Sequence, residues 1–147
     1  MIDKRKFYIN GIWTNPIIKN DYAVINPSTE QSYAFISLGT KKDVDLAVSA
    51  AKKAFSTWSQ VEKKEKINLL ENLLKIYKRR WNEITQTMSE EMGAPLDWSS
   101  SAQTSSGADH INDFILRLKN FEFEKRFNTN SNNYIVYEPI GVCGLIT

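Results

Sequence analysis

The apolar run at the C-terminal end constrains the fold more than any other part of the sequence. This run is Gly141-Val142-Cys143-Gly144-Leu145-Ile146-Thr147, and it follows closely after Pro139. A short, uninterrupted apolar run is typical of a strand that is buried on both faces of a parallel sheet. Such a strand needs a neighbouring strand on each side, and the chain ends at its last residue. We therefore expect an α/β fold that is incomplete.

The N-terminal residues predict two pairs of strands. Asn10-Gly11 lies between two β-forming triplets, 7–9 and 12–14, and both turn positions tolerate a positive φ. This arrangement is a strong signal for a hairpin. A second pair of strands is expected at 22–25 and 33–37, around a turn formed by Asn, Pro, Ser and Thr.

Apolar residues then recur every three or four positions, which predicts helices. Thr40 with Asp43 three residues later marks a helix start, and the apolar stripe that follows extends to Trp58. A second stripe covers 67–88. We interpret it as two consecutive packed helices that break near Arg80, although the same spacing could form a coiled coil.

The remaining residues predict one more helix and a second hairpin. Gly93 and then Pro95 form a helix stop, and another helix is expected from 96 to about 120 with a weakly determined, serine-rich first half. Beyond it, β-forming residues flank the polar stretch 128–133. We therefore expect a long hairpin over 121–137.

The composition is that of an ordinary globular domain, with 147 residues of which 41% are apolar and 24% charged. The net charge is +2, and basic residues are interleaved with acidic ones, which argues against a nucleic-acid-binding surface. The basic triplets at 4–6 and 78–80 are interpreted as a solvated end and a solvated helix turn. The single cysteine excludes an internal disulfide, and no apolar run follows the N-terminus as a signal peptide would require. We expect a cytoplasmic protein.

Six motifs occur in a recognisable order along nearly the whole chain. They are Tyr8-Ile9-Asn10-Gly11 with Trp13; Ile25-Asn26-Pro27-Ser28-Thr29; Leu38-Gly39-Thr40 with Asp43-Val44-Asp45 and Ala47-Val48; Ala50-Ala51 through Ala54-Phe55 to Trp58; Glu91-Met92-Gly93-Ala94-Pro95; and Glu138-Pro139-Ile140-Gly141-Val142 with Gly144-Leu145-Ile146-Thr147. In their order and spacing they resemble the N-terminal part of the aldehyde dehydrogenase superfamily.

The resemblance implies a division of the chain into three parts. Residues 1–120 correspond to the N-terminal part of an NAD(P)-binding domain with a Rossmann-like sheet. Residues 121–138 match the family's oligomerisation arm, and 139–147 match the first strand of the cofactor-binding sheet. The resemblance thus implies a truncated chain that carries hairpins, helices and an arm, and that belongs to a homo-oligomer.

The resemblance also implies a function that this chain alone lacks. The family oxidises an aldehyde to a carboxylic acid with NAD or NADP, through a cysteine nucleophile, a glutamate base and an asparagine that holds the oxyanion. All three lie after the end of this chain. We therefore expect no catalytic residue here and no tight cofactor binding, with only Ile146 and Thr147 at the edge of the cofactor site.

Three further candidates were weighed for chemistry. Some family members hold a monovalent cation at positions that match Val24, Ile25 and Glu91, although an ordinary strand end and a solvated glutamate explain these residues equally well. Cys143 is predicted to be a small buried thiol rather than a nucleophile. His110, the only histidine, is expected to be exposed or capped.

Two alternatives to an enzyme fragment remain. The chain could be an interaction module that associates with full-length subunits through its β arm. It could also be a helical binding protein based on 67–88, which ranks last because core packing in an α/β protein gives the same spacing. For each of these three interpretations we expect a marginally stable or association-prone chain, because strand edges would be unpaired and apolar stripes exposed.

Overall fold

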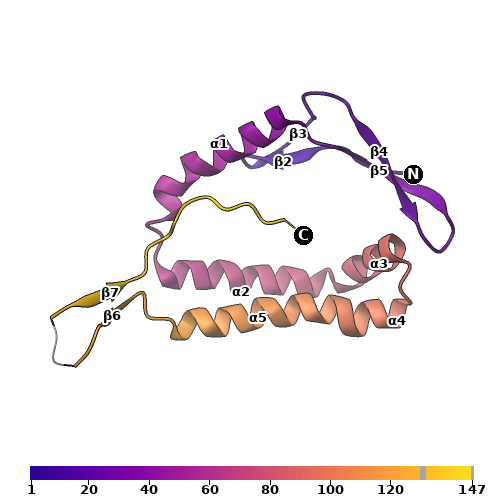
Figure 1. Ribbon diagram of the computed structural model, residues 1–147. Helices are drawn as coiled ribbons and strands as arrows, with labels where there is room; N and C mark the ends of the chain where they lie inside the picture. The colour runs from indigo at the N-terminus through magenta and orange to yellow at the C-terminus, as the bar shows by residue number, and fades with distance from the viewer. Residues whose placement is uncertain (130–131, 147) are drawn as a thin grey trace.

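The structure is a computed structural model that describes residues 1–129 and 132–146, drawn as a ribbon in Figure 1. Its strands are β1 (Ile2–Lys4), β2 (Phe7–Ile9), β3 (Ile12–Thr14), β4 (Asp21–Asn26), β5 (Gln31–Ser37), β6 (Glu124–Arg126) and β7 (Tyr134–Val136). Its helices are α1 (Lys41–Trp58), α2 (Lys63–Arg79), α3 (Trp81–Met92), α4 (Leu96–Trp98), the π-helical segment η1 (Ser99–Thr104) and α5 (Ser105–Asn120).

The predicted hairpins are confirmed. β2 and β3 pair antiparallel across Asn10-Gly11, and both turn residues have positive φ, at 53° and 80°. β4 and β5 pair antiparallel, and β1 adds to β5 in parallel, so the main sheet has the order β1-β5-β4. β6 and β7 form a separate hairpin that projects from the body of the molecule (Figure 1).

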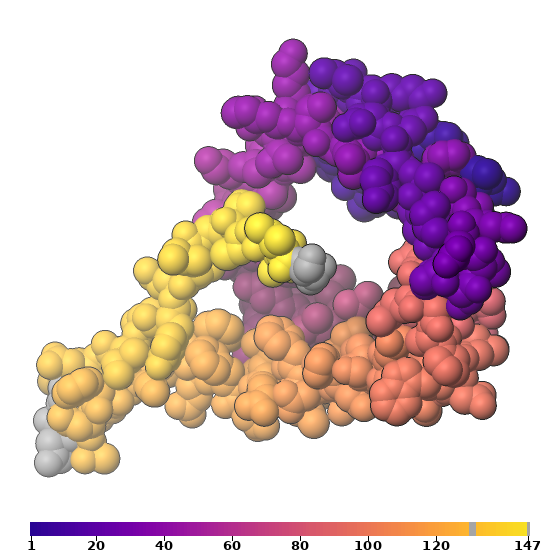
Figure 2. Space-filling view, turned by 45° about the vertical axis from the view of Figure 1, so that its right-hand side comes forward, coloured from indigo at the N-terminus to yellow at the C-terminus, as the bar shows by residue number. Residues whose placement is uncertain are grey.

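All helices after α1 form a layer that lies across from the sheet (Figure 1). α2 packs along α5, and α3 contacts η1 and β4. The sheet and α1 lie on the opposite side, and Figure 2 shows a hollow between the two parts into which the C-terminal segment reaches. The predicted break near Arg80 is confirmed, because α2 ends and α3 begins on either side of that residue.

The serine-rich first half of the predicted last helix is a π-helical turn. α4, η1 and α5 follow one another without a break, and Ser99 and Thr104 within η1 are fully buried. Thr104 shares a hydrogen bond of 2.9 Å with the Thr85 hydroxyl, and its carbonyl accepts one of 3.0 Å from the Tyr77 hydroxyl. Small hydroxyl side chains therefore let this turn pack closely against α2 and α3, which explains the scarcity of apolar residues there.

The C-terminal strand expected at 139–147 does not form in the described residues. Residues 137–146 have no regular secondary structure, and Ile140, Leu145 and Ile146 are each more than 90% exposed. Cys143, which we expected to be buried, is exposed as well. The reason is that no neighbouring strand pairs with this segment in the part of the chain described, so nothing covers it.

The solvated end expected at 4–6 is found only in part, because Lys4 and Lys6 are exposed but Arg5 is half-buried. Residues 2–4 form β1 at the edge of the main sheet, and the Arg5 side chain is only 30% exposed. The Arg5 guanidinium lies 4.8 Å from the ring centroid of Phe35 in β5. Pairing with β5 is a long-range contact, which the local pattern of charges does not reveal.

Gly93 joins the end of α3 to the turn between β4 and β5. It has a φ of 69°, and a Cβ at this position would lie 2.8 Å from Cγ of Pro27. The predicted helix stop is therefore confirmed. The absence of a side chain lets the helix end touch the sheet.

Replacing Gly93 with alanine is expected to lower the free energy of unfolding by about 1–2 kcal/mol, since alanine disfavours a positive φ. The contact of the new Cβ with Pro27 should add to this loss. Urea unfolding of the two proteins measures the effect. The control is Gly144→Ala, where a Cβ meets no atom within 4 Å. Equal unfolding midpoints for Gly93→Ala and the native chain would contradict the close approach.

Candidate functional site

The predicted cation ligands lie where α3 ends against the β4–β5 hairpin. Val24 pairs with Ala34 and Ile25 pairs with Ser32, so the register shifts between these two positions. Tyr33 is the extra residue of β5 opposite this shift. A bulge of this kind bends the strand and leaves the extra residue outside the regular ladder.

Tyr33 links the bulge to the C-terminal end of α3. Its hydroxyl donates a hydrogen bond of 2.7 Å to Oε1 of Glu91. The close contact between Gly93 and Pro27 holds the same two elements together two residues further along α3. The structure therefore brings Glu91 to the strand that pairs with Val24 and Ile25.

The environment of Tyr33 keeps its hydroxyl protonated. Partial burial raises the pKa of Tyr33 well above its ordinary value, and the hydrogen bond to the Glu91 carboxylate raises it further. A neutral phenol is the form that can donate to a carboxylate. Tyr33 thus remains a hydrogen-bond donor over the whole neutral range.

The residues at this position fit part of a cation site. Carbonyl oxygens at a bulge and a carboxylate are ligand types that hard cations prefer, and the bond from Tyr33 uses one of the two carboxylate oxygens of Glu91. Ile25 and Glu91 are both exposed. Across the described ranges, no group of three or more His, Cys, Asp or Glu side chains could hold a metal.

The residues expected near the cofactor are at the C-terminal end of the chain. Thr147 lies outside the described residues, and Ile146 is 97% exposed on a segment without regular structure. None of the described pockets is lined by residues 140–146.

The predicted arm is anchored to the helical layer by a lysine. Nζ of Lys63 donates hydrogen bonds to the carbonyls of Lys119 (3.1 Å) and Phe121 (3.0 Å), at the point where α5 ends and the arm begins. Phe121 also contacts the rings of Phe123 and Tyr137, with centroids 5.0 and 5.2 Å apart. A cation at a helix C-terminus is favourable because it meets unpaired carbonyls.

Two residues that carry this geometry were missed from the sequence, namely Tyr33 and Lys63. Tyr33 meets Glu91 across 58 positions, and Lys63 meets Phe121 across 58 positions as well. No local spacing signals such contacts. His110 is exposed on α5, as expected.

Of the helices in the described ranges, none has the length and apolar character needed to cross a membrane.

Comparisons with known proteins agree with the motifs. The sequence model of the aldehyde dehydrogenase family matches residues 13–147. A 3-succinoylsemialdehyde-pyridine dehydrogenase of a Pseudomonas species is 41% identical over all of this chain, which covers 30% of that relative.

Solved structures give the same result for the fold. The chain resembles an aldehyde dehydrogenase from Bartonella henselae with a TM-score of 0.88 and 45% identity, over 90% of this chain and 28% of that one. It also resembles a mutant aldehyde dehydrogenase from Pseudomonas syringae, solved in complex with NAD+ and octanal, with a TM-score of 0.82 and 31% identity, over 84% of this chain and 26% of the other. The chain thus spans about 30% of the length of the curated relatives it matches.

Replacing Tyr33 with phenylalanine tests the bond to Glu91. At pH 8 the variant is expected to lose about 0.5–1.5 kcal/mol of unfolding free energy, the usual contribution of one hydrogen bond. The pKa of Tyr33 is higher in the folded chain than in the unfolded chain, where it is about 10. The contribution of Tyr33 to the free energy of unfolding is therefore fully present below about pH 10 and is lost as the pH rises further. The difference between the native chain and Tyr33→Phe should therefore shrink from pH 8 to pH 11. Thermal melts measure it, with Tyr22→Phe as the exposed control; a difference that does not depend on pH would contradict the assignment.

Proposed function

The chain belongs to the aldehyde dehydrogenase family, and from this membership we propose that it serves as the N-terminal part of an enzyme that oxidises an aldehyde to a carboxylic acid with NAD or NADP. The family match over residues 13–147 carries the proposal. Two similar structures, one of them solved with NAD+ and octanal, support it.

We assign three structural roles within that enzyme. Residues 1–120 contribute to the cofactor-binding domain, 121–138 to the oligomerisation arm, and 139–147 to the first strand of the cofactor sheet. The apolar composition of 140–146 and the exposure of Ile140, Leu145 and Ile146 support the last assignment, because a strand of this kind is stable only between neighbours. Ile146 and Thr147 would then lie at the end of that strand, where ligands of open α/β sheets bind.

In the proposed enzyme, NAD or NADP would accept a hydride when bound. The residues of this chain would serve as a structural scaffold. Cys143 is exposed, and its Sγ lies 3.9 Å from the Gly141 carbonyl oxygen, which does not activate a thiol. The chain alone is therefore expected to lack dehydrogenase activity.

We further propose that the bulge near Val24 and Ile25, together with Glu91, holds a monovalent cation. The hydrogen bond from Tyr33 to Glu91 supports this proposal, because it fixes the carboxylate beside the strand that pairs with both residues. The cation would neutralise Glu91 and bind α3 more firmly to the sheet.

The function is tested with a chimera and with the chain alone. Residues 1–147 replace the matched N-terminal 30% of the Pseudomonas relative, which is 41% identical to them. The chimera is expected to reduce NAD or NADP with an aldehyde, followed by absorbance of the reduced cofactor, whereas the 147-residue chain is expected to show no turnover. A folded chimera without activity would argue against the proposed role, and turnover by the chain alone would contradict the predicted inactivity.

A second candidate function follows from the geometry of the arm. The Tyr137 N–H donates to the Phe123 carbonyl (2.8 Å), and the Phe127 N–H donates to the Asn133 carbonyl (2.9 Å). Hydrogen-bonded pairs alternate with non-bonded pairs in an antiparallel hairpin. The backbone groups of Tyr134 and Val136 therefore point away from β6.

This outer edge of β7 could pair with a strand of another subunit. The side chains of Tyr134 and Val136 are half exposed, and a two-stranded hairpin is only marginally stable alone. An added strand would form hydrogen bonds with the outward backbone groups of β7 and cover these side chains. We propose that the chain associates in this way with a full-length subunit.

Replacing Val136 with proline is expected to abolish that association, because proline removes an outward N–H without breaking a bond to β6. Co-purification of the tagged chain with the full-length Pseudomonas relative measures it. The matched control is Val136→Ala, which keeps the N–H and should still bind. Equal recovery with the proline and alanine variants, or no recovery with the native chain, would exclude strand pairing through this edge.

A further inference from the structure

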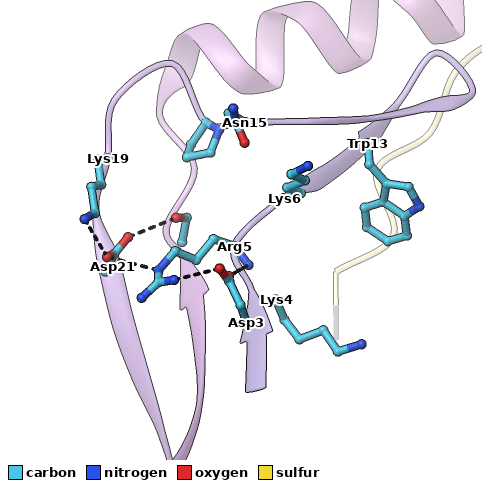
Figure 3. Close-up of a pocket in the computed structure, with 10 residues that line it drawn as sticks. Asp3, Lys4, Arg5, Lys6, Trp13, Asn15, Lys19 and Asp21 are labelled. Atoms are coloured by element: carbon cyan, nitrogen blue, oxygen red, sulfur yellow. Dashed lines mark hydrogen bonds and ion pairs between the residues drawn. The ribbon is translucent and has the colours of Figure 1, made fainter. Parts of the chain in front are cut away.

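A pocket lies between β1, the β2–β3 hairpin and the loop that leads into β4 (Figure 3). Its volume is about 750 Å³, which is within the range of sites that bind small organic molecules. Its lining includes four basic side chains, Lys4, Arg5, Lys6 and Lys19, and one large aromatic side chain, Trp13. None of the roles proposed above uses this pocket.

One side of the pocket is neutralised by ion pairs. Arg5 lies 2.9 Å from an Asp3 carboxylate oxygen and 3.0 Å from one of Asp21, and Lys19 lies 3.3 Å from the same oxygen of Asp21. Figure 3 shows these contacts of Arg5, Lys19 and the two aspartates. The Ser37 hydroxyl also donates a hydrogen bond of 3.5 Å to Asp21. These groups are held in place and form a structural wall.

The other side of the pocket keeps uncompensated positive charge. Within the described residues, Lys4 and Lys6 have no carboxylate within 4 Å. Asp3 and Glu83, whose carboxyl pKa values Lys6 and Lys4 help to lower, are already paired with Arg5 and Arg80. Four basic and two acidic lining residues leave a net charge of +2. This part of the pocket therefore attracts an anion.

Trp13 adds an aromatic surface beside the two lysines. Its side chain is 67% exposed, and its ring leans against Tyr8 with the centroids 5.2 Å apart, which fixes its orientation. In Figure 3, Trp13, Lys4 and Lys6 lie on the side of the pocket away from Asp21. An exposed indole is a stacking surface for a flat ring.

We propose that this pocket binds an aromatic anion, a flat ring that carries a phosphate or a carboxylate group. The ring stacks on Trp13, and the anionic group pairs with the ammonium group of Lys4 or Lys6. A ligand with only a ring or only an anion uses half of the site. The sequence motif Lys4-Arg5-Lys6 thus has two roles, since Arg5 builds the wall and the flanking lysines recognise the ligand.

Calorimetric titration of the 147-residue chain tests the proposal with four probes. Phenyl phosphate and benzoate carry both parts of the ligand, phenol carries only the ring, and inorganic phosphate only the anion. Saturable binding is expected for phenyl phosphate, benzoate or both, and the stronger of the two identifies the anionic group. Binding of phenol and phosphate should be at least about tenfold weaker, as expected when one charge-assisted contact or one stacking contact is lost.

Variants assign the binding to these residues. The double variant Lys4→Met/Lys6→Met is expected to raise Kd at least about tenfold, Trp13→Ala to do the same, and Trp13→Phe to restore most of the affinity. The control is Lys52→Met/Lys53→Met, two exposed lysines on α1, which should leave Kd unchanged. Circular dichroism melts confirm that each variant is folded. The proposal would be overturned if neither phenyl phosphate nor benzoate bound saturably. It would also be overturned if the control variant lost as much affinity as the pocket variants.

Discussion

The buried carboxylate of Asp43 fixes how the first helix leaves the sheet. Asp43 is 5% exposed and accepts three hydrogen bonds: from the Thr40 N–H (2.8 Å), the Thr40 hydroxyl (2.6 Å) and the Ile17 N–H (2.9 Å). These bonds, the one from the Thr40 hydroxyl foremost, hold the pKa of Asp43 below its ordinary value, so the group stays charged. One side chain thereby caps α1 and ties it to the loop that precedes β4.

A second set of contacts joins that unit to the helical layer. Glu91 and Gly93 at the end of α3 meet Tyr33 in β5 and Pro27 in the turn, through a charge-assisted hydrogen bond and a contact that only glycine permits. The apolar core of the described residues is small. Ala34, Ala108 and Ile115 are the buried apolar residues within the described ranges. Hydrogen bonds such as those of Asp43 and Glu91 therefore fix the relative positions of helices and strands, which in other proteins depend on a larger apolar core.

The sequence predicted those features that depend on neighbours along the chain. The Asn10-Gly11 turn, the Thr40–Asp43 cap and the Gly93 stop each involve residues a few positions apart, and each is found. The features that it missed depend on distant partners. β1 exists because β5 lies beside it, and Glu91 is fixed by Tyr33. The strand expected at the C-terminus fails for the same reason, since a strand needs partners that its own residues cannot supply.

The exposed apolar surface shows what kind of neighbour the fold requires. α2 carries one apolar stripe that faces α5, including Leu74 beside Ile115, and a second stripe of Leu69, Leu73 and Ile76 that is 44–48% exposed. A helix that is apolar on two sides is stable when it lies between two layers. In the run 140–146, Ile140, Leu145 and Ile146 are more than 90% exposed, and the run suits a strand covered on both faces. The helix and the run 140–146 both carry apolar surface of the kind that the layers of α/β proteins cover.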